Sequence, residues 1–265
     1  ERFRAALVRA AAESVDFAIV SGDLVYDALR ADAATAAARF ATYDAIARRS
    51  PVPLRPVIGN HDVFGIERAS SHVAPGADGY GKALYEEKEG PRYSAFDRGR
   101  IHFIVLDTIG IDDTRYFGFL DAPQLDWIRR ELQHVPAGTT VVTVGHIPLR
   151  SGALALGYAA ERLAHTLLRS PAPPSYQHVV RNADALASLL APYRWTLALQ
   201  GHTHVAEKLA PAAGTLTRYQ TAPAATARPE PGSPPGFFVY TVSGDAVDDG
   251  VLVTLEGAKG QGAGE

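Results

Sequence analysis

The sequence predicts a mixed α/β fold in one domain spanning residues 1–265, and three observations support this prediction. Short apolar runs typical of buried strands recur along the chain. Stretches with apolar residues at helical spacing separate several of these runs, which is the pattern of an α/β core. The last three strand-like runs have no helix between them and add antiparallel character. With 265 residues, 46% of them hydrophobic, the chain can bury a substantial core.

The individual elements follow from local signals. Helical spacing predicts helices over residues 1–13 and 31–49, and two prolines end the second of these. Two further helices begin after the N-cap residues Asp121 and Asn182. The expected strands cover residues 15–20, 54–58, 101–106, 140–144, 195–199, 216–221, 237–242 and 251–255.

Two longer segments receive a separate interpretation. Residues 63–92 form an insertion of the length that often serves as a substrate lid. Within it Tyr80, Lys82 and Arg92 are candidates for substrate contact, with a structural role as the alternative for each. Residues 205–265 are expected to supply the C-terminal strands of a second sheet.

Composition argues against several classes of protein. Lys and Arg total 26 against 29 Asp and Glu, a formal net charge of -3, so binding to duplex nucleic acid is not expected. No apolar stretch approaches the roughly 20 residues that span a bilayer. The absence of Cys excludes disulfides, thiolate metal sites and a Cys nucleophile. Because the chain contains no Met, even at position 1, we expect it to lack its original N-terminus; neither localisation nor oligomeric state is indicated.

Polar clusters follow four of the predicted strands, each at the point where the strand ends. A Gly lies in every cluster and permits a tight turn that directs a short side chain back over the sheet edge. Because open α/β sheets place ligand sites at the carboxyl ends of their strands, we expect the four clusters to meet. The clusters are Ser21-Gly22-Asp23, Gly59-Asn60-His61-Asp62, Gly145-His146 and Gly201-His202-Thr203-His204.

The residue types in these clusters are those that bind divalent transition metals. Imidazoles and carboxylates are common ligands of such ions, and a carboxylate can bridge two of them. Taken alone, a Gly-Asp pair after a strand is more often a turn or a helix cap. A His-x-His pair is ambiguous too, because alternate strand residues need not share a metal. Four such clusters at one sheet edge favour a metal site over these alternatives.

In this order over residues 15–204, the four clusters resemble the signature of the calcineurin-like metallophosphoesterase superfamily. The resemblance implies a four-layer α/β/β/α sandwich with mixed sheets. It also implies two divalent or mixed-valence metal ions, of Mn, Fe or Zn. Asp23 would bridge the two ions. The remaining ligands would be Asn60, His146 and His202 at one ion, and His204 at the other.

The same resemblance gives catalytic roles to two residues beside the ligands. In the family, the His of Gly-Asn-His-Asp lies beside the leaving group. His61 is therefore the candidate proton donor or transition-state stabiliser, and Asp62 is the candidate to orient it. An imidazole titrates near neutral pH, which suits protonation of an alkoxide leaving group.

The chain departs from the family pattern in two places. The superfamily opens with an Asp-x-His-like strand before the first helix, whereas this chain starts at that helix. We therefore expect the first strand to be missing and the second metal site to be incomplete. Tyr26 stands three residues after Asp23, where other branches usually have Asp. Tyr at this spacing resembles the purple acid phosphatase branch, where it binds ferric iron; the alternative is that Tyr26 packs on the following helix.

These features predict hydrolysis of a phosphate ester, monoester or diester, by a metal-bound hydroxide. The expected partner is a small-molecule phosphate ester. The alternative among enzymes is a cyclic or linear nucleotide phosphodiesterase, against which Tyr26 weighs. The alternative from another class is a non-catalytic binding protein on the same fold.

Overall fold

Strands and helices alternate through the structure much as the sequence predicts. The computed structural model describes residues 1–152, 176–210, 214–226 and 233–255. Its α-helices are α1 (Arg2–Ala12), α2 (Ala33–Ala47), α3 (Arg68–Ser71), α4 (Ala83–Glu89), α5 (Ala122–Glu131) and α7 (Ala183–Leu190). Short 3-10 turns are η1 (Ala28–Arg30), η2 (Asn60–Asp62) and η3 (Leu132–His134). None of the helices in these ranges has the length and apolar character that a membrane crossing requires.

The strands are short, and most of them fall where apolar runs predict them. The first seven are β1 (Ala18–Val20), β2 (Leu54–Pro56), β3 (Ser94–Arg98), β4 (Ile101–Val105), β5 (Ile109–Asp112), β6 (Arg115–Gly118) and β7 (Thr140–Val144). The others are β8 (Arg194–Gln200), β9 (Glu207–Leu209), β10 (Arg218–Thr221), β11 (Gly236–Val239), β12 (Val242–Ser243), β13 (Ala246–Val247) and β14 (Val251–Thr254).

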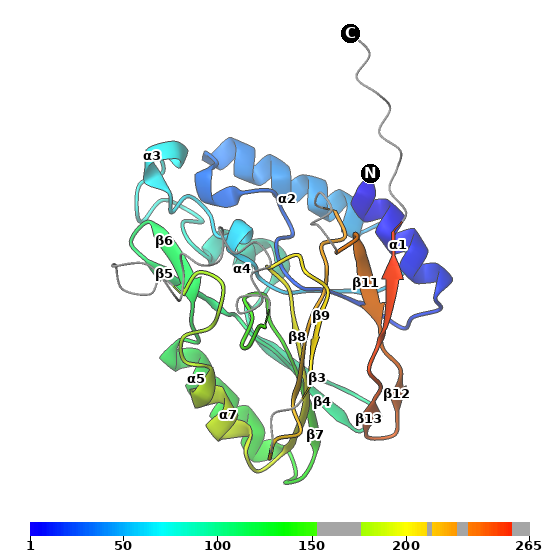
Figure 1. Cartoon of the computed structure of the whole chain (residues 1–265). Helices are drawn as coiled ribbons and strands as arrows, with labels where there is room; N and C mark the ends of the chain where they lie inside the picture. The colour runs from blue at the N-terminus through cyan, green and yellow to red at the C-terminus, as the bar shows by residue number, and fades with distance from the viewer. Residues whose placement is uncertain (153–175, 211–213, 227–232, 256–265) are drawn as a thin grey trace.

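A six-stranded mixed sheet lies at the centre of the molecule, with the strand order β3-β4-β7-β8-β10-β9 (Figure 1). The four inner strands are parallel, while β3 and β9 at the edges are antiparallel to their neighbours. β4 and β7 are buried along their whole length, which is why their sequences are nearly continuous apolar runs. The carboxyl ends of the parallel strands therefore meet at one edge. The predicted mixed α/β fold is confirmed.

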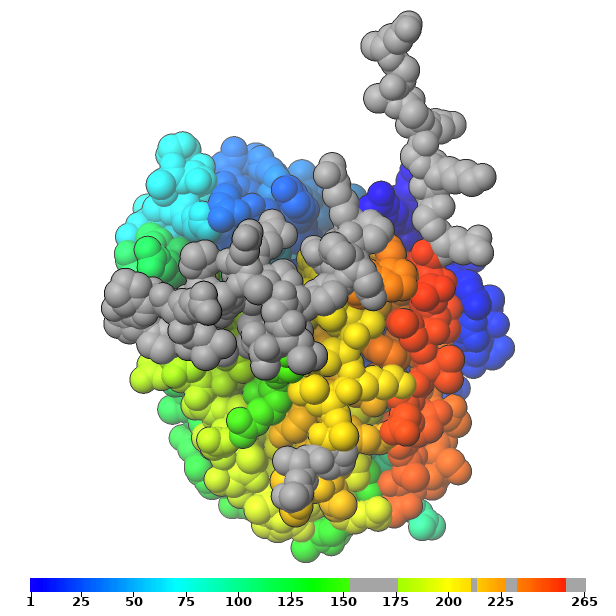
Figure 2. All heavy atoms as spheres, viewed as in Figure 1, coloured from blue at the N-terminus to red at the C-terminus, as the bar shows by residue number. Residues whose placement is uncertain are grey.

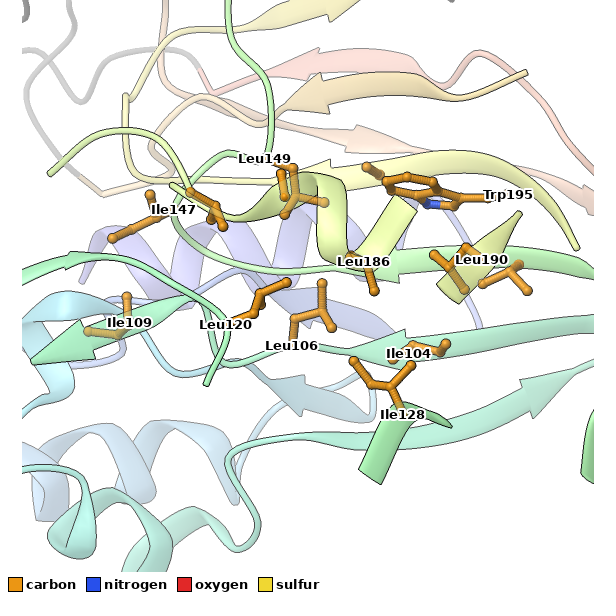
Figure 3. Packing of buried hydrophobic residues seen from close by; sticks show 14 of the residues in the cluster. Ile104, Leu106, Ile109, Leu120, Ile128, Ile147, Leu149, Leu186, Leu190 and Trp195 are labelled. Carbon is orange, nitrogen blue, oxygen red and sulfur yellow. The ribbon is translucent and has the colours of Figure 1, made fainter. Parts of the chain in front are cut away.

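Helices α5 and α7 cover one face of this sheet. Ile128 of α5 and Leu186 and Leu190 of α7 belong to the same buried cluster as Ile104 of β4 and Trp195 of β8 (Figure 3). Burial of these side chains fixes both helices against the sheet, because each fully buried aliphatic side chain contributes about 1.5–3 kcal/mol.

Both helices start at the predicted residue, but the two starts differ. Asp121 Oδ1 accepts a hydrogen bond from the backbone N of Gln124 at 2.8 Å, which caps α5. Asn182 Oδ1 instead accepts from the backbone N of Leu120 at 2.9 Å, and its Nδ2 donates to the carbonyl of Leu120 at 2.8 Å. Asn182 therefore ties the start of α7 to the loop before α5 and makes no side-chain cap on its own helix.

A second β layer covers the opposite face of the six-stranded sheet. Val142 of β7 and Leu197 of β8 pack with Ile19 of β1, and with Val242 and Val247 of β12 and β13. Beyond this layer, α2 packs on the segment that follows β2. The order of the layers is therefore helices, central sheet, small sheets and helices, which is the four-layer arrangement expected from the sequence.

The C-terminal strands divide between the two β layers, whereas residues 205–265 were expected to lie in the second sheet. β10 pairs in parallel with β8, and β9 pairs with β10, so both extend the central sheet. β10 lies along the edge of β8 opposite β7, and Thr217, just before β10, adds a hydrogen bond there from its Oγ1 to the carbonyl of Trp195 at 2.9 Å. Strand patterning does not encode this choice of partner. β11 to β14 form two separate pairs, and Figure 2 shows this end of the chain at the surface near α1.

Residues 63–92, the predicted lid, are held against the central sheet by ion pairs. Tyr85 of α4 is almost completely buried. Lys82 Nζ lies 2.5 Å from Oδ2 of Asp107, and a terminal nitrogen of Arg92 lies 2.6 Å from the same oxygen. Two of the three residues considered for substrate contact are therefore engaged in structural ion pairs. The lid role of the segment stays a prediction.

Candidate metal centre

Four side chains of the ligand type converge at the carboxyl ends of β1, β2, β7 and β8. His146 Nε2 lies 3.2 Å from Asp23 Oδ1 and 3.1 Å from Asn60 Oδ1. His202 Nδ1 lies 3.2 Å from the same nitrogen. One ligand atom from each of Asp23, His146 and His202 falls within 4.8 Å of the other two. The structure thus brings together four of the five residues that the family resemblance implies as ligands.

The fifth residue, His204, lies two positions beyond His202 in the same loop. Its charge contributes to lowering the pKa of His202, although burial is the larger cause, so the two imidazoles are close enough to interact. The backbone carbonyl of His204 accepts a hydrogen bond from Ser233 Oγ at 3.1 Å, which ties the loop to the segment before β11. His204 is not part of the compact group formed by Asp23, His146 and His202.

The turns that carry the ligands use backbone conformations that L-residues rarely adopt. Asp23 has a φ of 54° and His202 a φ of 71°, both in the left-handed region. Two glycines permit the close approach of the loops. A Cβ on Gly22 would lie 2.2 Å from His146 Nδ1, and a Cβ on Gly59 would lie 2.2 Å from the backbone N of Asp23. Unusual backbone conformations that surround one polar cluster indicate a functional site.

A backbone contact fixes the ring orientation of His146. Its Nδ1 lies 2.7 Å from the carbonyl oxygen of Ser21, so this nitrogen donates a proton there. Nε2 is then the atom that faces Asp23, Asn60 and His202. A hydrogen bond of this kind on the far ring nitrogen is what orients metal-binding histidines in general.

Burial and the neighbouring charges set the protonation of the cluster. Burial alone would raise the pKa of Asp23, but the charge and hydrogen bond of His146 outweigh it and lower that pKa. Burial would lower the pKa of His146, but the carboxylate of Asp23 reverses this and raises it. Burial and the charges of His146 and His178 hold the pKa of His202 well below its usual range. Asp23 is therefore an anion and His202 a neutral imidazole, which are the forms that bind metal ions.

The donor set fits a divalent transition metal. Oxygen atoms of Asp23 and Asn60 and a ring nitrogen of His202 each lie 3.1 to 3.2 Å from Nε2 of His146. Lone pairs gathered at this distance repel unless a proton or a cation lies between them. No Lys or Arg forms an ion pair with Asp23 in the described part of the chain. Mixed nitrogen and oxygen ligands of this kind suit Mn, Fe or Zn.

His61 borders the cluster and faces a carboxylate. Its backbone N donates to Asp23 Oδ1 at 3.0 Å, and its side chain is 35% exposed. Its Nδ1 lies 3.6 Å from Oδ1 of Asp27. Both atoms are buried, and neither has a hydrogen-bond partner within the described ranges. Asp27 is therefore a carboxylate that the structure places directly beside this imidazole.

Asp62, which the resemblance implies as the residue that orients His61, contacts the backbone. Its Oδ2 accepts from the backbone N of Gly59 at 2.7 Å, and its Oδ1 accepts from the backbone N of Val25 at 3.0 Å. Burial raises the pKa of Asp62 to about 8, although these two N–H donors favour the charged form. Any effect of Asp62 on His61 is thus exerted through the turn that carries both residues.

Tyr26, for which the sequence leaves metal binding and helix packing open, is 79% exposed. Its ring is nearly parallel to the imidazole of His61, with 6.4 Å between the ring centroids. The guanidinium carbon of Arg39, on α2, lies 5.4 Å from the centroid of the Tyr26 ring. The contact with the following helix is therefore a cation–π contact. Binding of a metal by Tyr26 stays a prediction.

One residue beside the candidate centre, His178, was not expected there from the sequence. His178 Nδ1 lies 2.8 Å from His202 Nε2, and burial lowers the pKa of His178. His178 belongs to no motif, and it reaches the centre because the neighbouring Val180 forms a β-bridge with Gly118. A lone His at an irregular position carries no signal of such a contact.

Fold and site together define a class, the metal-binding α/β enzymes with their ligands at strand ends. Comparison with protein families identifies the family within that class. The calcineurin-like phosphoesterase profile matches residues 1–206, so the chain belongs to this family and is a metal-dependent phosphoesterase. The predicted superfamily is confirmed.

Comparison with solved structures agrees on the fold. A dimetal phosphatase from Danio rerio is similar to this chain with a TM-score of 0.53. The sequences are 16% identical, and the match covers 86% of this chain and 78% of that chain. At this level of identity the similarity concerns the fold. No curated protein sequence matches the chain.

Proposed function

We propose that the protein hydrolyses a small phosphate ester at a centre of two metal ions, Mn, Fe or Zn. Asp23 would contribute to both ion sites, with Asn60, His146 and His202 completing one of them and His204 belonging to the other. When bound, two such ions polarise the ester, activate water and stabilise charge on the attacking and leaving oxygens. The observation that carries the proposal is the approach of Asp23, Asn60 and His202 to His146 Nε2, within 3.2 Å or less.

His61 is the proton donor in this proposal. Its backbone N–H to Asp23 keeps the residue beside the centre, and its partial exposure leaves the imidazole open to a substrate. Because Nδ1 faces Asp27, Nε2 is the atom left to give a proton to the leaving oxygen. Asp62 would hold the turn that carries His61, through its two backbone contacts.

The neutral carboxamide of Asn60 also suits this chemistry. An Asp at this position would add negative charge beside an anionic phosphate, whereas Asn supplies an oxygen ligand without that charge. Asn60 is almost completely buried and lies 3.1 Å from His146 Nε2, so its orientation is fixed by the cluster. The preference for a phosphate ester over a neutral ester therefore has a local physical reason.

Elemental analysis and turnover test the proposal together. We expect purified protein to contain Mn, Fe or Zn, with up to two ions per chain. Hydrolysis of nitrophenyl phosphate or of bis-nitrophenyl phosphate should be lost with a chelator and restored by one of these metals. The ratio of the two rates separates a monoesterase from a diesterase.

A matched control for the site is Asp16→Ala, which removes an exposed carboxylate paired with Arg98 and should keep metal and activity. Protein that neither contains nor responds to these metals would contradict the proposal. Metal binding without hydrolysis of either ester type would favour a binding protein on the same fold.

A further inference from the structure

Tyr26 presents an aromatic ring to solvent beside the proposed proton donor. With 79% of its surface accessible to solvent, Tyr26 is the most exposed of the large hydrophobic residues within the described ranges. Its ring and the imidazole of His61 differ in orientation by 7°, and their centroids are 6.4 Å apart. An exposed aromatic ring at the border of a polar site is available for contact with a ligand bound there.

The ring of Tyr26 lies against ordered neighbours despite its exposure. The guanidinium carbon of Arg39 lies 5.4 Å from the ring centroid. Arg39 is itself held, because it donates to the backbone carbonyl of Asp27 at 2.7 Å. Asp27 in turn accepts from a terminal nitrogen of Arg30 at 2.9 Å. The aromatic surface is therefore supported by a charged network, which lowers the entropy lost when a ligand contacts it.

We propose that Tyr26 forms a platform for a planar ring in the leaving group, so that the preferred substrates are phosphate esters of aromatic or heteroaromatic alcohols. This inference rests on the proposed function, since it takes His61 as the residue beside the leaving oxygen. A leaving group that extends from His61 toward solvent passes the neighbouring aromatic surface of Tyr26. A flat ring can stack there, whereas a puckered aliphatic ring of similar size cannot make the same contact.

Two esters with alkoxide leaving groups separate stacking from intrinsic reactivity. Benzyl phosphate carries a flat ring, and cyclohexylmethyl phosphate carries a puckered ring at the same distance from the phosphate. We expect the wild-type chain, loaded with Mn²⁺, to prefer the benzyl ester in kcat/KM. Tyr26→Ala should reduce this preference about threefold to tenfold, the usual range for one aromatic pair.

The matched variant Tyr26→Phe keeps the ring and removes the hydroxyl group. We expect it to retain the preference for the benzyl ester together with the metal content of the wild type. Leu216→Ala, which removes an exposed side chain outside the site, serves as the control for a general surface effect. Loss of metal in Tyr26→Phe would identify the phenol as a metal ligand and overturn the platform. An unchanged preference in Tyr26→Ala would overturn it as well.

Binding of phosphonates distinguishes failure of the platform from failure of the proposed hydrolysis. 2-Phenylethylphosphonate and 2-cyclohexylethylphosphonate resemble the two esters but cannot be hydrolysed at the bridging position. If the chain hydrolyses neither ester yet binds the phenyl compound more tightly, and Tyr26→Ala removes that difference, the platform stands and the proposed hydrolysis fails. Equal affinity of the wild-type chain for the two phosphonates, or no binding of either, would overturn the platform.

Discussion

Asp23 and Asp107 are carboxylates in neighbouring loops, but their charges are balanced in different ways. Asp107 follows β4, and Lys82 and Arg92 lie 2.5 and 2.6 Å from its Oδ2. Its side chain is completely buried. Asp23 follows β1, and its Oδ1 lies 3.2 Å from Nε2 of His146. One carboxylate is thus neutralised by cations of the chain itself, and the other is surrounded by imidazoles.

The two loops touch, so the difference arises over a short distance. Thr108, next to Asp107, accepts at Oγ1 from the backbone N of His146 and of Ile147, at 3.2 and 2.8 Å. A buried carboxylate with two largely buried cations fixes the fold, since removing the carboxylate takes away the anion that both cations share. A carboxylate surrounded by imidazoles and a carboxamide has no Lys or Arg among the described residues to balance its negative charge, so it can bind a metal cation. The groups around a buried carboxylate, and not the carboxylate itself, therefore decide between a structural role and metal binding.

The largest effect is expected at Asp23. Asp23→Ala removes the anion of the cluster and the residue proposed to contribute to both ion sites. We expect metal content to fall to background and turnover of phosphate esters to fall by on the order of 10³ or more, because both depend on the same ligand. Elemental analysis and steady-state kinetics on one preparation check this. A variant that keeps its metal would show that the imidazoles bind the metal without the carboxylate. Asp23 would then differ from Asp107 in its neighbours but not in its role.

The next largest effect is a loss of stability at Asp107. Asp107→Asn keeps the shape of the side chain but removes the anion that Lys82 and Arg92 share, both of which are less than one-fifth exposed. Arg92 keeps its ion pair with Asp121, at 2.7 Å. We expect the free energy of unfolding in urea to fall by about 3–5 kcal/mol, the usual cost of breaking a buried pair. Unfolding of the metal-free form should be measured, so that metal binding does not contribute.

The control for this substitution is Asp126→Asn, at an exposed ion pair with Arg129. Exposed pairs contribute little, so this variant should unfold at nearly the same urea concentration as the wild type. Metal loss by folded Asp107→Asn would contradict the comparison, because it would give Asp107 a role in the centre.

The contrast between these loops also explains what the sequence could reveal. Four candidate ligands were predictable because Asp23, Asn60, His146 and His202 each follow a Gly at a strand end. Parallel pairing of β1 with β2 and of β7 with β8 brings these ends together within each pair. Local pattern therefore determined their position. The ion pairs of Asp107 were not predictable, since both cations come from the insertion over residues 63–92, whose path depends on packing.

The parts of the site that the sequence could not reveal involve contacts across the fold. His178 reaches His202 through a β-bridge between segments far apart in the chain, and no local pattern encodes that bridge. Asp27 was not distinguished as a partner of His61, because its position depends on a left-handed turn with a φ of 54°. Likewise, no local pattern shows that β10 pairs with β8, and β9 with β10, in the central sheet.

A smaller effect, dependent on the substrate, is expected at His61, which borders Asp23 without belonging to the ligand set. If its imidazole gives a proton to the leaving oxygen, an alkyl ester needs it more than an activated aryl ester does. We expect His61→Ala to reduce turnover of an alkyl phosphate by on the order of 10² and that of a nitrophenyl ester much less. Metal content should stay unchanged.

Two other results at His61 would change its assignment. Equal losses for the two substrates would leave only an electrostatic role for the side chain. Loss of metal would place His61 among the metal ligands, together with Asp23.

The last expected effect is a pH dependence at Asp62, a third buried carboxylate, which accepts hydrogen bonds from two backbone N–H groups. Burial raises its pKa to about 8 from an unfolded value of 3.8, so between these pH values the folded chain holds a proton that the unfolded chain has lost. The stability of the metal-free protein should therefore decrease as pH rises from about 4 to 8, by at most about 1.4 kcal/mol per pH unit from this group. Urea unfolding of the wild type and of Asp62→Asn over this range measures the difference in slope. Since Asn does not ionise, the plot of stability against pH should be flatter for Asp62→Asn than for the wild type. Parallel plots would mean that Asp62 is ionised in the folded chain. Two N–H donors would then stabilise this carboxylate as the two cations stabilise Asp107.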